Sequence, residues 1–154
     1  MHFTVLVVIP DRDEQIQTGK QLTQAVSDAL EPFSEHKCYQ CGDDCESCDK
    51  MRCWDWWLIG GRWTGIFDVQ EGIGFSGEPG VDTDQNLDPN KADAVRNKYL
   101  TGNLPKVAVV LKNGVWNDLQ HGYYPDDWWD KESTFRAYAE AHPNDWFVVV
   151  DCHT

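Results

Sequence analysis

Residues 2–9 read HFTVLVVI, an almost continuous run of apolar and β-branched side chains that ends at Pro10. A strand with one face in water would alternate apolar and polar residues, so this run predicts a strand that is covered on both faces and lies centrally in its sheet. Residues 146–152, WFVVVDC, show the same pattern. We therefore expect these two strands to lie side by side in the middle of one sheet.

Three segments carry helix signals. Residues 11–30 have an imperfect apolar stripe behind a cap at Asp11 or Asp13, and residues 88–100 open with Asp-Pro, a cap followed by proline at the first helical position. Residues 130–141 predict an amphipathic helix that ends before a His-Pro pair. We expect two to three helices flanking the sheet.

Two turns between apolar or aromatic runs give the remaining strand signals. An Asn-Gly pair at 113–114 follows KVAVVL at residues 106–111 and is the clearest hairpin signal in the chain. Within residues 54–69, a Gly-Gly pair separates two aromatic runs and predicts a strand, a turn or bulge, and a second strand.

Together these signals predict a single α+β domain over residues 1–154, with the terminal strands central in a mixed or antiparallel sheet. A ferredoxin-like arrangement of the strands and helices is one fold that would be consistent with these signals. A Cys-rich segment at residues 36–53 is expected to form a metal-stapled loop inserted within this domain.

The cysteines of that loop are the most specific chemical signal in the chain. Five of the six lie there: Cys38, Cys41, Cys45, Cys48 and Cys53. The first four form two C-x2-C pairs, and tetrahedral zinc is commonly bound by two such pairs. Only three residues separate the pairs, so a mononuclear site could skip Cys45 and use Cys53, and His36 is a further candidate ligand.

Four interpretations of these cysteines stay open: structural zinc, disulfides, an iron–sulfur cluster and free thiols. Met1-His2 leads straight into a short apolar run, without the basic and longer apolar regions of a secretion signal. We therefore expect a reducing compartment, which disfavours disulfides. Structural Zn²⁺ is favoured over catalytic zinc, because an all-cysteine shell leaves no open position for water.

The charge of the chain restricts its partners. There are 26 acidic and 13 basic residues, and the formal net charge is −13. Proteins that bind a phosphate backbone carry clustered Lys and Arg, so direct nucleic-acid binding is disfavoured, whereas an acidic surface could attract a basic protein. The charge could also serve solubility alone. No stretch approaches the ~18 apolar residues that predict a membrane span.

The chain contains eight tryptophans, four of them in the block WDWWLIGGRW at residues 54–63. The candidate ligand-binding residues in this block are Trp54, Trp56, Trp57, Gly60, Gly61, Arg62 and Trp63. Backbone N–H groups of the glycine turn and the guanidinium could hold an anion, while an indole stacks on a planar ring. The alternative is that the indoles belong to the core and that Arg62 pairs with Asp55 or Asp68.

Asp151, Cys152 and His153 place a carboxylate, a thiol and an imidazole at the end of the last strand. Neighbours on a strand point to opposite faces, so the three cannot act as a catalytic triad. Asp151 and His153 are expected to share a face, with His121 as a further acid–base candidate. Cys152 is expected to be an ordinary buried thiol.

The W-D-W-x-x-x-G-G-R-W block, the start MHFTV and the D-C-H motif at residues 151–153 resemble a group of small uncharacterised proteins encoded by tailed bacteriophages. In that group a variable loop that often carries C-x2-C pairs precedes the block, and a valine-rich strand ends in D-C-H. The resemblance covers most of the chain. It implies action in the cytoplasm of an infected bacterium and no particular activity.

We therefore expect a non-enzymatic phage accessory or counter-defence protein, whose zinc-stapled loop and aromatic surface bind a basic host protein or a small nucleotide-like ligand. The main alternative is an enzyme acting on a nucleotide or related anion, with His121, Asp151 and His153 as acid–base residues and Arg62 holding the substrate. His121, His153 and Arg62 should then line one pocket. A virion structural or assembly protein is the second alternative.

Overall fold

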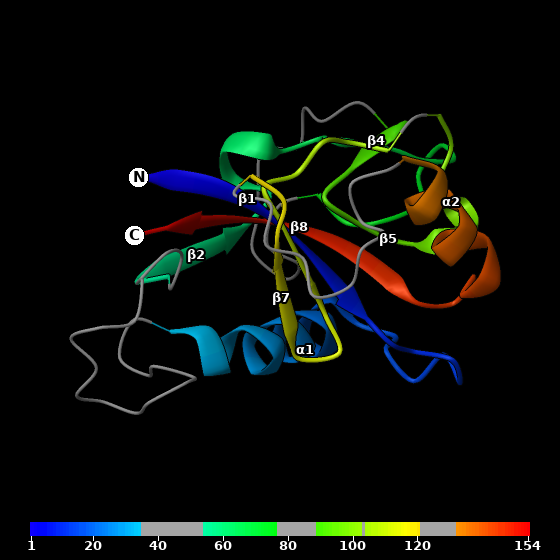
Figure 1. Cartoon of the computed structure of the whole chain (residues 1–154). Helices are drawn as coiled ribbons and strands as arrows, with labels where there is room; N and C mark the ends of the chain where they lie inside the picture. Colours follow the sequence, from blue (N-terminus) through cyan, green and yellow to red (C-terminus); the bar gives the residue numbers. More distant parts are fainter. Residues whose placement is uncertain (35–53, 77–88, 103, 121–131) are drawn as a thin grey trace.

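The computed structural model describes residues 1–34, 54–76, 89–102, 104–120 and 132–154. They form an α+β structure on a mixed six-stranded sheet, whose main strand order is β2-β8-β1-β6-β7 (Figure 1). β1 (His2–Ile9) and β8 (Trp146–His153) pair antiparallel along their whole lengths in the middle of this order. The expected central pair of terminal strands is confirmed.

The other strands extend the sheet on both sides of this pair. β6 (Val109–Lys112) runs parallel to β1, and β7 (Val115–Asp118) returns antiparallel beside β6. On the other side, β2 (Trp56–Ile59) and β5 (Ala94–Arg96) pair with different halves of β8. Because β1 and β6 are parallel and directly adjacent, the sheet is not the split βαβ arrangement of a ferredoxin-like fold.

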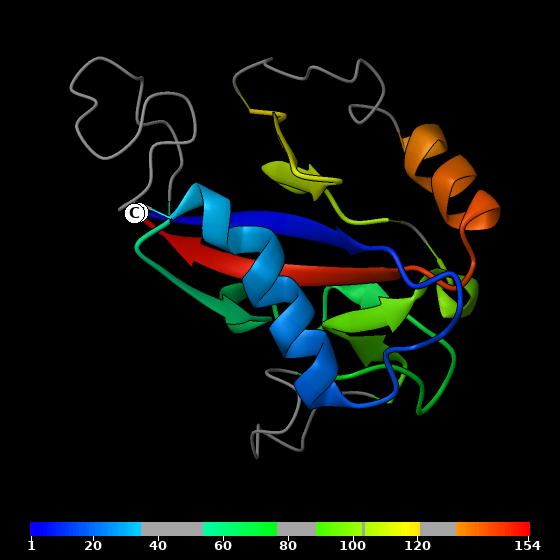
Figure 2. The same cartoon turned by 90° about the horizontal axis from the view of Figure 1, so that it is seen from below.

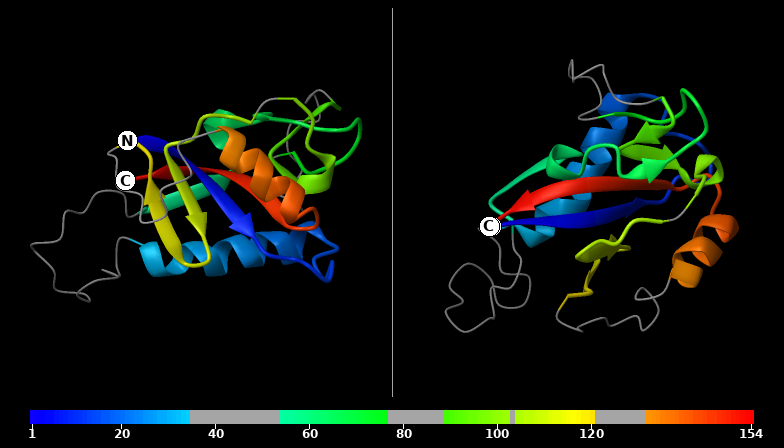
Figure 3. Two further views of the ribbon diagram at one scale, coloured as in Figure 1. Left: turned by 45° about the vertical axis from the view of Figure 1, so that its right-hand side comes forward. Right: turned by 90° about the horizontal axis from the view of Figure 1, so that it is seen from above.

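A helix covers each face of the central strands (Figures 2 and 3). α1 (Gly19–Leu30) lies on one face and buries three side chains there: Leu22, Val26 and Leu30. α2 (Glu132–Ala141) lies on the opposite face and buries Phe135 and Tyr138. Full burial of one large apolar side chain contributes about 1.5–3 kcal/mol. Both faces of β1 therefore carry apolar residues, which explains the unbroken run in the sequence.

The first helix begins later than the sequence predicts. Thr18 is its N-cap and forms a capping box with Gln21, so residues 11–17 precede the helix. The Asp11 carboxylate instead accepts hydrogen bonds from two backbone N–H groups of the following loop. It also accepts one from Arg96, with 2.7 Å between Arg96 Nη1 and Asp11 Oδ2. The predicted start at residue 11 is wrong, because this carboxylate is used in a long-range ion pair.

The helix predicted at residues 88–100 is also wrong. The described part of this segment forms β4 (Lys91–Ala92), β5 and a short 3-10 helix, η3 (Asn97–Tyr99). β4 pairs with β3 (Phe67–Asp68) in a separate two-stranded sheet, and β5 pairs with β8. Strand pairing with distant parts of the chain outweighs the local Asp-Pro signal.

Other predictions are confirmed in whole or in part. The Asn-Gly hairpin joins β6 to β7, and Asn113 and Gly114 both have positive φ, at 51° and 74°. α2 matches the amphipathic helix predicted near residues 130–141. β2 and β3 both form within residues 54–69, but they pair with β8 and β4 and not with each other. Across the ranges given above, no helix has the length and apolar character to cross a bilayer.

Candidate functional site

The candidate site lies at the sheet edge where β2 pairs with the end of β8 (Figure 1). The register sets Trp56 opposite His153, and His153 opposite His2 of β1. Directly opposed residues point to the same face, so three rings gather there. The His2 ring centroid lies 4.9 Å from that of His153 and 6.1 Å from that of Trp56, both in edge-on geometry. Trp56 is 47% exposed.

Each histidine is paired with a carboxylate. His2 Nδ1 lies 2.8 Å from Asp151 Oδ1, and His153 Nδ1 lies 2.8 Å from Asp55 Oδ1. The Asp151 side chain is 2% exposed, whereas that of Asp55 is 37% exposed. Solvent screens the second pair far more than the first. Asp151 is therefore the structural centre of the cluster, and Asp55 is its solvent-facing carboxylate.

Two buried carboxylates hold the Gly-Gly-Arg-Trp turn that follows β2. Asp151 Oδ2 accepts the backbone N–H of Arg62 at 3.0 Å. Asp93 is fully buried and accepts from the Thr64 hydroxyl at 2.9 Å and from the backbone N–H of Gly65. The turn is thus bonded to β8 on one side and to the β4–β5 segment on the other.

This close approach explains the two glycines. Gly60 and Gly61 have φ of 77° and 54°, a region that L side chains rarely adopt. A Cβ on Gly60 would lie 2.5 Å from Asp93 Oδ2, and a Cβ on Gly61 would lie 2.5 Å from Asp151 Cβ. Any side chain at either position would push a buried carboxylate away from the turn.

The same contacts change what the turn can bind. The N–H groups of Arg62 and Gly65 donate to the chain's own carboxylates, and those of Trp63 and Thr64 donate to carbonyl oxygens within the turn. These four donors are therefore not available to an external anion. The Arg62 side chain, which is exposed, remains available to an anion.

Arg62 does not make the ion pairs considered from the sequence. Asp55 is bonded to His153, and Asp68 is bonded to Lys91. Within the described ranges the Arg62 guanidinium makes no hydrogen bond or ion pair, so it is free to contact a partner at the rim of the site.

The four tryptophans of the block differ in environment. Trp54 donates its indole N–H to the Leu30 carbonyl at 2.8 Å and meets Trp57 edge-on at 6.5 Å. Trp54 and Trp57 pack against the α1 side of the core, and Trp63 packs against the α2 side. Trp56 is the one of these four that is largely exposed. A stacking or anchoring role therefore falls to Trp56.

The acid–base candidates are only partly brought together. Asp151 and His153 share a face, but the carboxylate bonds to His2, a residue that the sequence analysis did not single out. The expected pairing of the terminal strands could have identified His2, because an antiparallel register sets residues 2 and 153 opposite each other. Cys152 points into the core, and burial raises the pKa of its thiol. His121 lies outside the described residues.

The candidate zinc ligands at residues 36–53 also lie outside the described residues. The residues on either side are held together, because Ser34 and Trp54 form a parallel bridge and the Trp54 N–H donates to the Phe33 carbonyl at 3.3 Å. In the part of the chain that is described, no group of three or more His, Cys, Asp or Glu side chains could hold a metal ion. Zinc at the Cys-rich segment remains a prediction.

Comparison with known proteins adds no relative. No family model matches the chain, and searches of the curated proteins and of the solved structures find no match either. The function of the site must follow from its own geometry and chemistry.

Proposed function

We propose that the protein is a non-enzymatic binding protein and that Trp56 anchors its partner. The observation that carries this proposal is a 47% exposed indole on a paired strand, beside two histidine rings that are hydrogen-bonded in place. Tryptophan is enriched among the residues that dominate binding energy, and a ring held by its neighbours loses little freedom on binding. Truncating such an anchor typically costs at least about 2 kcal/mol of binding energy.

Of the two partner classes expected from the sequence, a basic protein is favoured over a small nucleotide-like anion. Two of the backbone donors of the turn, the N–H groups of Arg62 and Gly65, are bonded to Asp151 and Asp93 and are not available to an anion. Asp55 is exposed beside the cluster, and the chain carries a formal charge of −13. A positive protein surface would be attracted and oriented by this field.

The resemblance to tailed-phage proteins suggests the setting. We infer an accessory or counter-defence role, in which the protein binds a basic host protein in the cytoplasm of an infected bacterium. The surface around Trp56 would then occupy a site at which that host protein normally contacts another molecule.

A zinc ion bound by the Cys-rich segment, which directly precedes Trp54 in the sequence, would support this surface. The proposal is that four of the five cysteines at 38, 41, 45, 48 and 53 bind one Zn²⁺ and fix the segment next to the binding face. Elemental analysis should find one zinc per chain, and a chelator should lower the melting temperature. A chain without zinc or iron, or a melting temperature unchanged by the chelator, would contradict it.

Affinity capture tests the binding proposal. The baits are the wild-type chain, Trp56→Ser and the matched control Ile73→Ser, since Ile73 is a second exposed apolar side chain at 37%. The lysate comes from phage-infected bacteria. We expect one basic protein to be retained by wild type and by Ile73→Ser, lost with Trp56→Ser, and released as salt rises from about 0.1 M to about 1 M. Equal recovery on Trp56→Ser would refute the proposal.

The two histidine–carboxylate pairs favour a second candidate, an enzyme that performs acid–base chemistry on a small anionic substrate. His2 and His153 lie next to each other and are each oriented by a carboxylate; because His153 Nε2 contacts the N-terminal ammonium at 3.3 Å, His2 is the candidate general base. Incubation with a panel of nucleotides, followed by phosphorus NMR, tests this candidate. Turnover that is lost in His2→Asn would support it, and the absence of turnover would exclude it for these substrates.

A further inference from the structure

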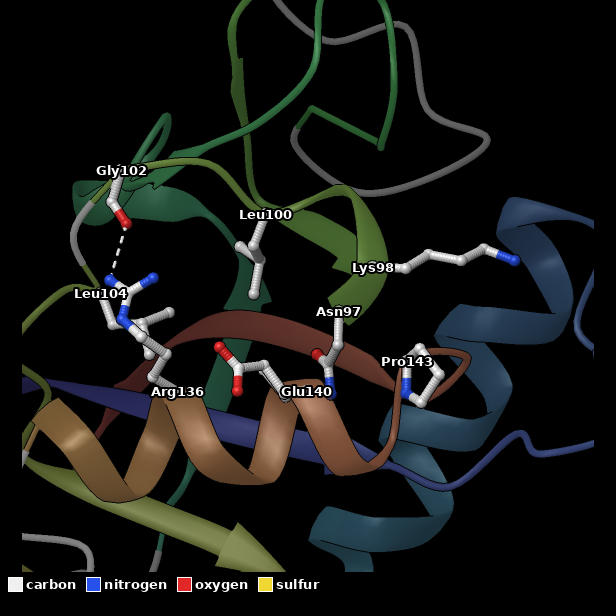
Figure 4. A pocket seen from close by; sticks show the side chains of 9 residues that line it. Asn97, Lys98, Leu100, Gly102, Leu104, Arg136, Glu140 and Pro143 are labelled. Atoms are coloured by element: carbon white, nitrogen blue, oxygen red, sulfur yellow. Dashed lines mark hydrogen bonds between the residues drawn. The ribbon is translucent and has the colours of Figure 1, made fainter.

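A pocket with a volume of about 210 Å³ lies between η3, the segment that follows it, and α2 (Figure 4). It is at the opposite end of the molecule from β2 (Figure 1). The lining residues that matter here are Asn97, Leu100, Leu104, Arg136, Glu140 and Pro143. A water molecule occupies about 30 Å³ of liquid, so the pocket has room for a molecule of fewer than about ten non-hydrogen atoms.

One wall of the pocket holds a buried acceptor without a partner. Asn97 is 4% exposed, and its Nδ2 donates to the His142 carbonyl at 3.0 Å. A carbonyl oxygen only accepts, so this bond fixes the orientation of the amide. Asn97 Oδ1 has no hydrogen-bond partner in the described part of the chain. Figure 4 shows this oxygen turned toward the pocket. This oxygen has less than 1 Å² of accessible surface, and buried acceptors are normally paired, so a ligand donor would reach it once a neighbouring side chain of the lining moves aside.

The facing wall holds a carboxylate. Glu140 projects from α2, and Figure 4 shows its oxygens on the same side as the Asn97 amide. Among residues with described positions, Glu140 makes no hydrogen bond or ion pair. Arg136, one turn earlier, donates instead to the Gly102 carbonyl at 3.1 Å. The Glu140 end of the pocket therefore presents two acceptors.

Neither cation of the lining, Lys98 or Arg136, forms an ion pair with Glu140 within the described residues. Lys98 also lines the pocket, but its ammonium group points away and is bonded to Glu14 Oε1 at 2.6 Å and Asn144 Oδ1 at 3.0 Å (Figure 4). The walls between the polar groups are apolar and come from Leu100 and Leu104. The pocket thus combines two convergent acceptors with a short apolar channel.

We propose that this pocket binds a small organic ammonium ion. The R–NH₃⁺ group donates to Asn97 Oδ1 and to the Glu140 carboxylate, and the apolar body of the ligand lies against Leu100 and Leu104. A metal ion held by the protein alone fits less well, because the Asn97 amide and the Glu140 carboxylate offer at most three oxygens and hard cations take six or more. An anion would meet two acceptors, whereas a cation is attracted by the net charge of −13.

Titration with n-butylammonium, followed by ¹⁵N NMR of the Asn97 side-chain amide, tests this proposal. The comparison ligands are 1-butanol, which is neutral, and butyrate, which is anionic. We expect a saturable shift with n-butylammonium and a much weaker response to both comparison ligands. Binding as tight with 1-butanol or with butyrate would overturn the proposal, as would the absence of a saturable shift with n-butylammonium.

Two variants connect the binding to the carboxylate. Glu140 is exposed, so Glu140→Gln should fold normally, and it should weaken n-butylammonium binding by about tenfold or more because a charge-assisted hydrogen bond is lost. Glu71→Gln removes the same charge from an exposed glutamate that does not line the pocket, and its affinity should stay within about twofold of wild type. Equal affinities for Glu140→Gln and Glu71→Gln would overturn the proposal.

Discussion

Replacing Asp151 by alanine should destabilise the fold far more than the same change at Asp55, although both carboxylates pair with a histidine on one face. Asp151 is 2% exposed and accepts from His2 at 2.8 Å and from the Arg62 N–H at 3.0 Å. A hydrogen bond to a charged group contributes about 1.5–3 kcal/mol, so Asp151→Ala should lose about 3–5 kcal/mol. Asp55→Ala breaks an exposed pair and should lose about 0–1 kcal/mol.

The assay is urea unfolding at neutral pH, followed by tryptophan fluorescence and by circular dichroism. If the slope of the transition is unchanged, the shift in its midpoint gives the change in the free energy of unfolding. Asp151→Asn keeps one acceptor and should fall between wild type and Asp151→Ala. A loss below about 1 kcal/mol for Asp151→Ala, or an equal loss for Asp55→Ala, would refute the claim that the buried carboxylate organises this face.

Three further predictions concern the turn, the ion pair and the thiol. Gly61→Ala should lose at least about 2 kcal/mol in thermal unfolding, because its Cβ would lie 2.5 Å from that of Asp151, whereas Gly114→Ala meets nothing within 4 Å and should lose only about 1 kcal/mol. Burial alone would raise the pKa of Asp11, but hydrogen bonds from a guanidinium, an indole and two backbone N–H groups outweigh it and hold the pKa below its usual value. The contribution of the Asp11 carboxylate to stability is full above the pKa of an unfolded aspartate, about 3.9, and is lost as the pH falls through the lowered pKa. Below about pH 4 the free energy of unfolding should therefore fall more steeply for wild type than for Asp11→Asn. Equal slopes for the two proteins would contradict this. Burial raises the pKa of the Cys152 thiol, so a thiol reagent should leave it unlabelled at about pH 8 until the chain unfolds. Mass spectrometry measures the labelling. Fast labelling of Cys152 in the folded protein would contradict its position in the core.

The sequence predicts those parts of the fold whose signal is local. Residues 2–9 and 146–152 do not alternate apolar and polar side chains along their length, and this alone places both strands in the centre of the sheet. The Asn-Gly hairpin follows from the positive φ that its two residues can adopt. The errors at residues 11 and 88–100 arise where long-range contacts decide. Asp11 is used by Arg96, and β5 is recruited by β8.

In the candidate site, too, the local features can be predicted from the sequence and the long-range contacts cannot. Its aromatic and glycine residues are visible in the sequence, but the purpose of the glycines is not. They suggest a nest for an external anion, whereas the structure uses the turn's N–H groups to bind Asp151 and Asp93. Both carboxylates come from distant positions in the chain, so spacing alone could not reveal them. His2 joins the site only through strand register.

Oxidative footprinting of Trp56 in the captured complex is the decisive measurement for the binding proposal. Trp56 is 47% exposed in the free chain, and an anchor at the centre of an interface loses its contact with water. We predict that its oxidation slows several-fold when the partner binds, while the oxidation of Ile73, 37% exposed, stays the same. An unchanged oxidation rate at Trp56 in the complex would show that the partner binds elsewhere.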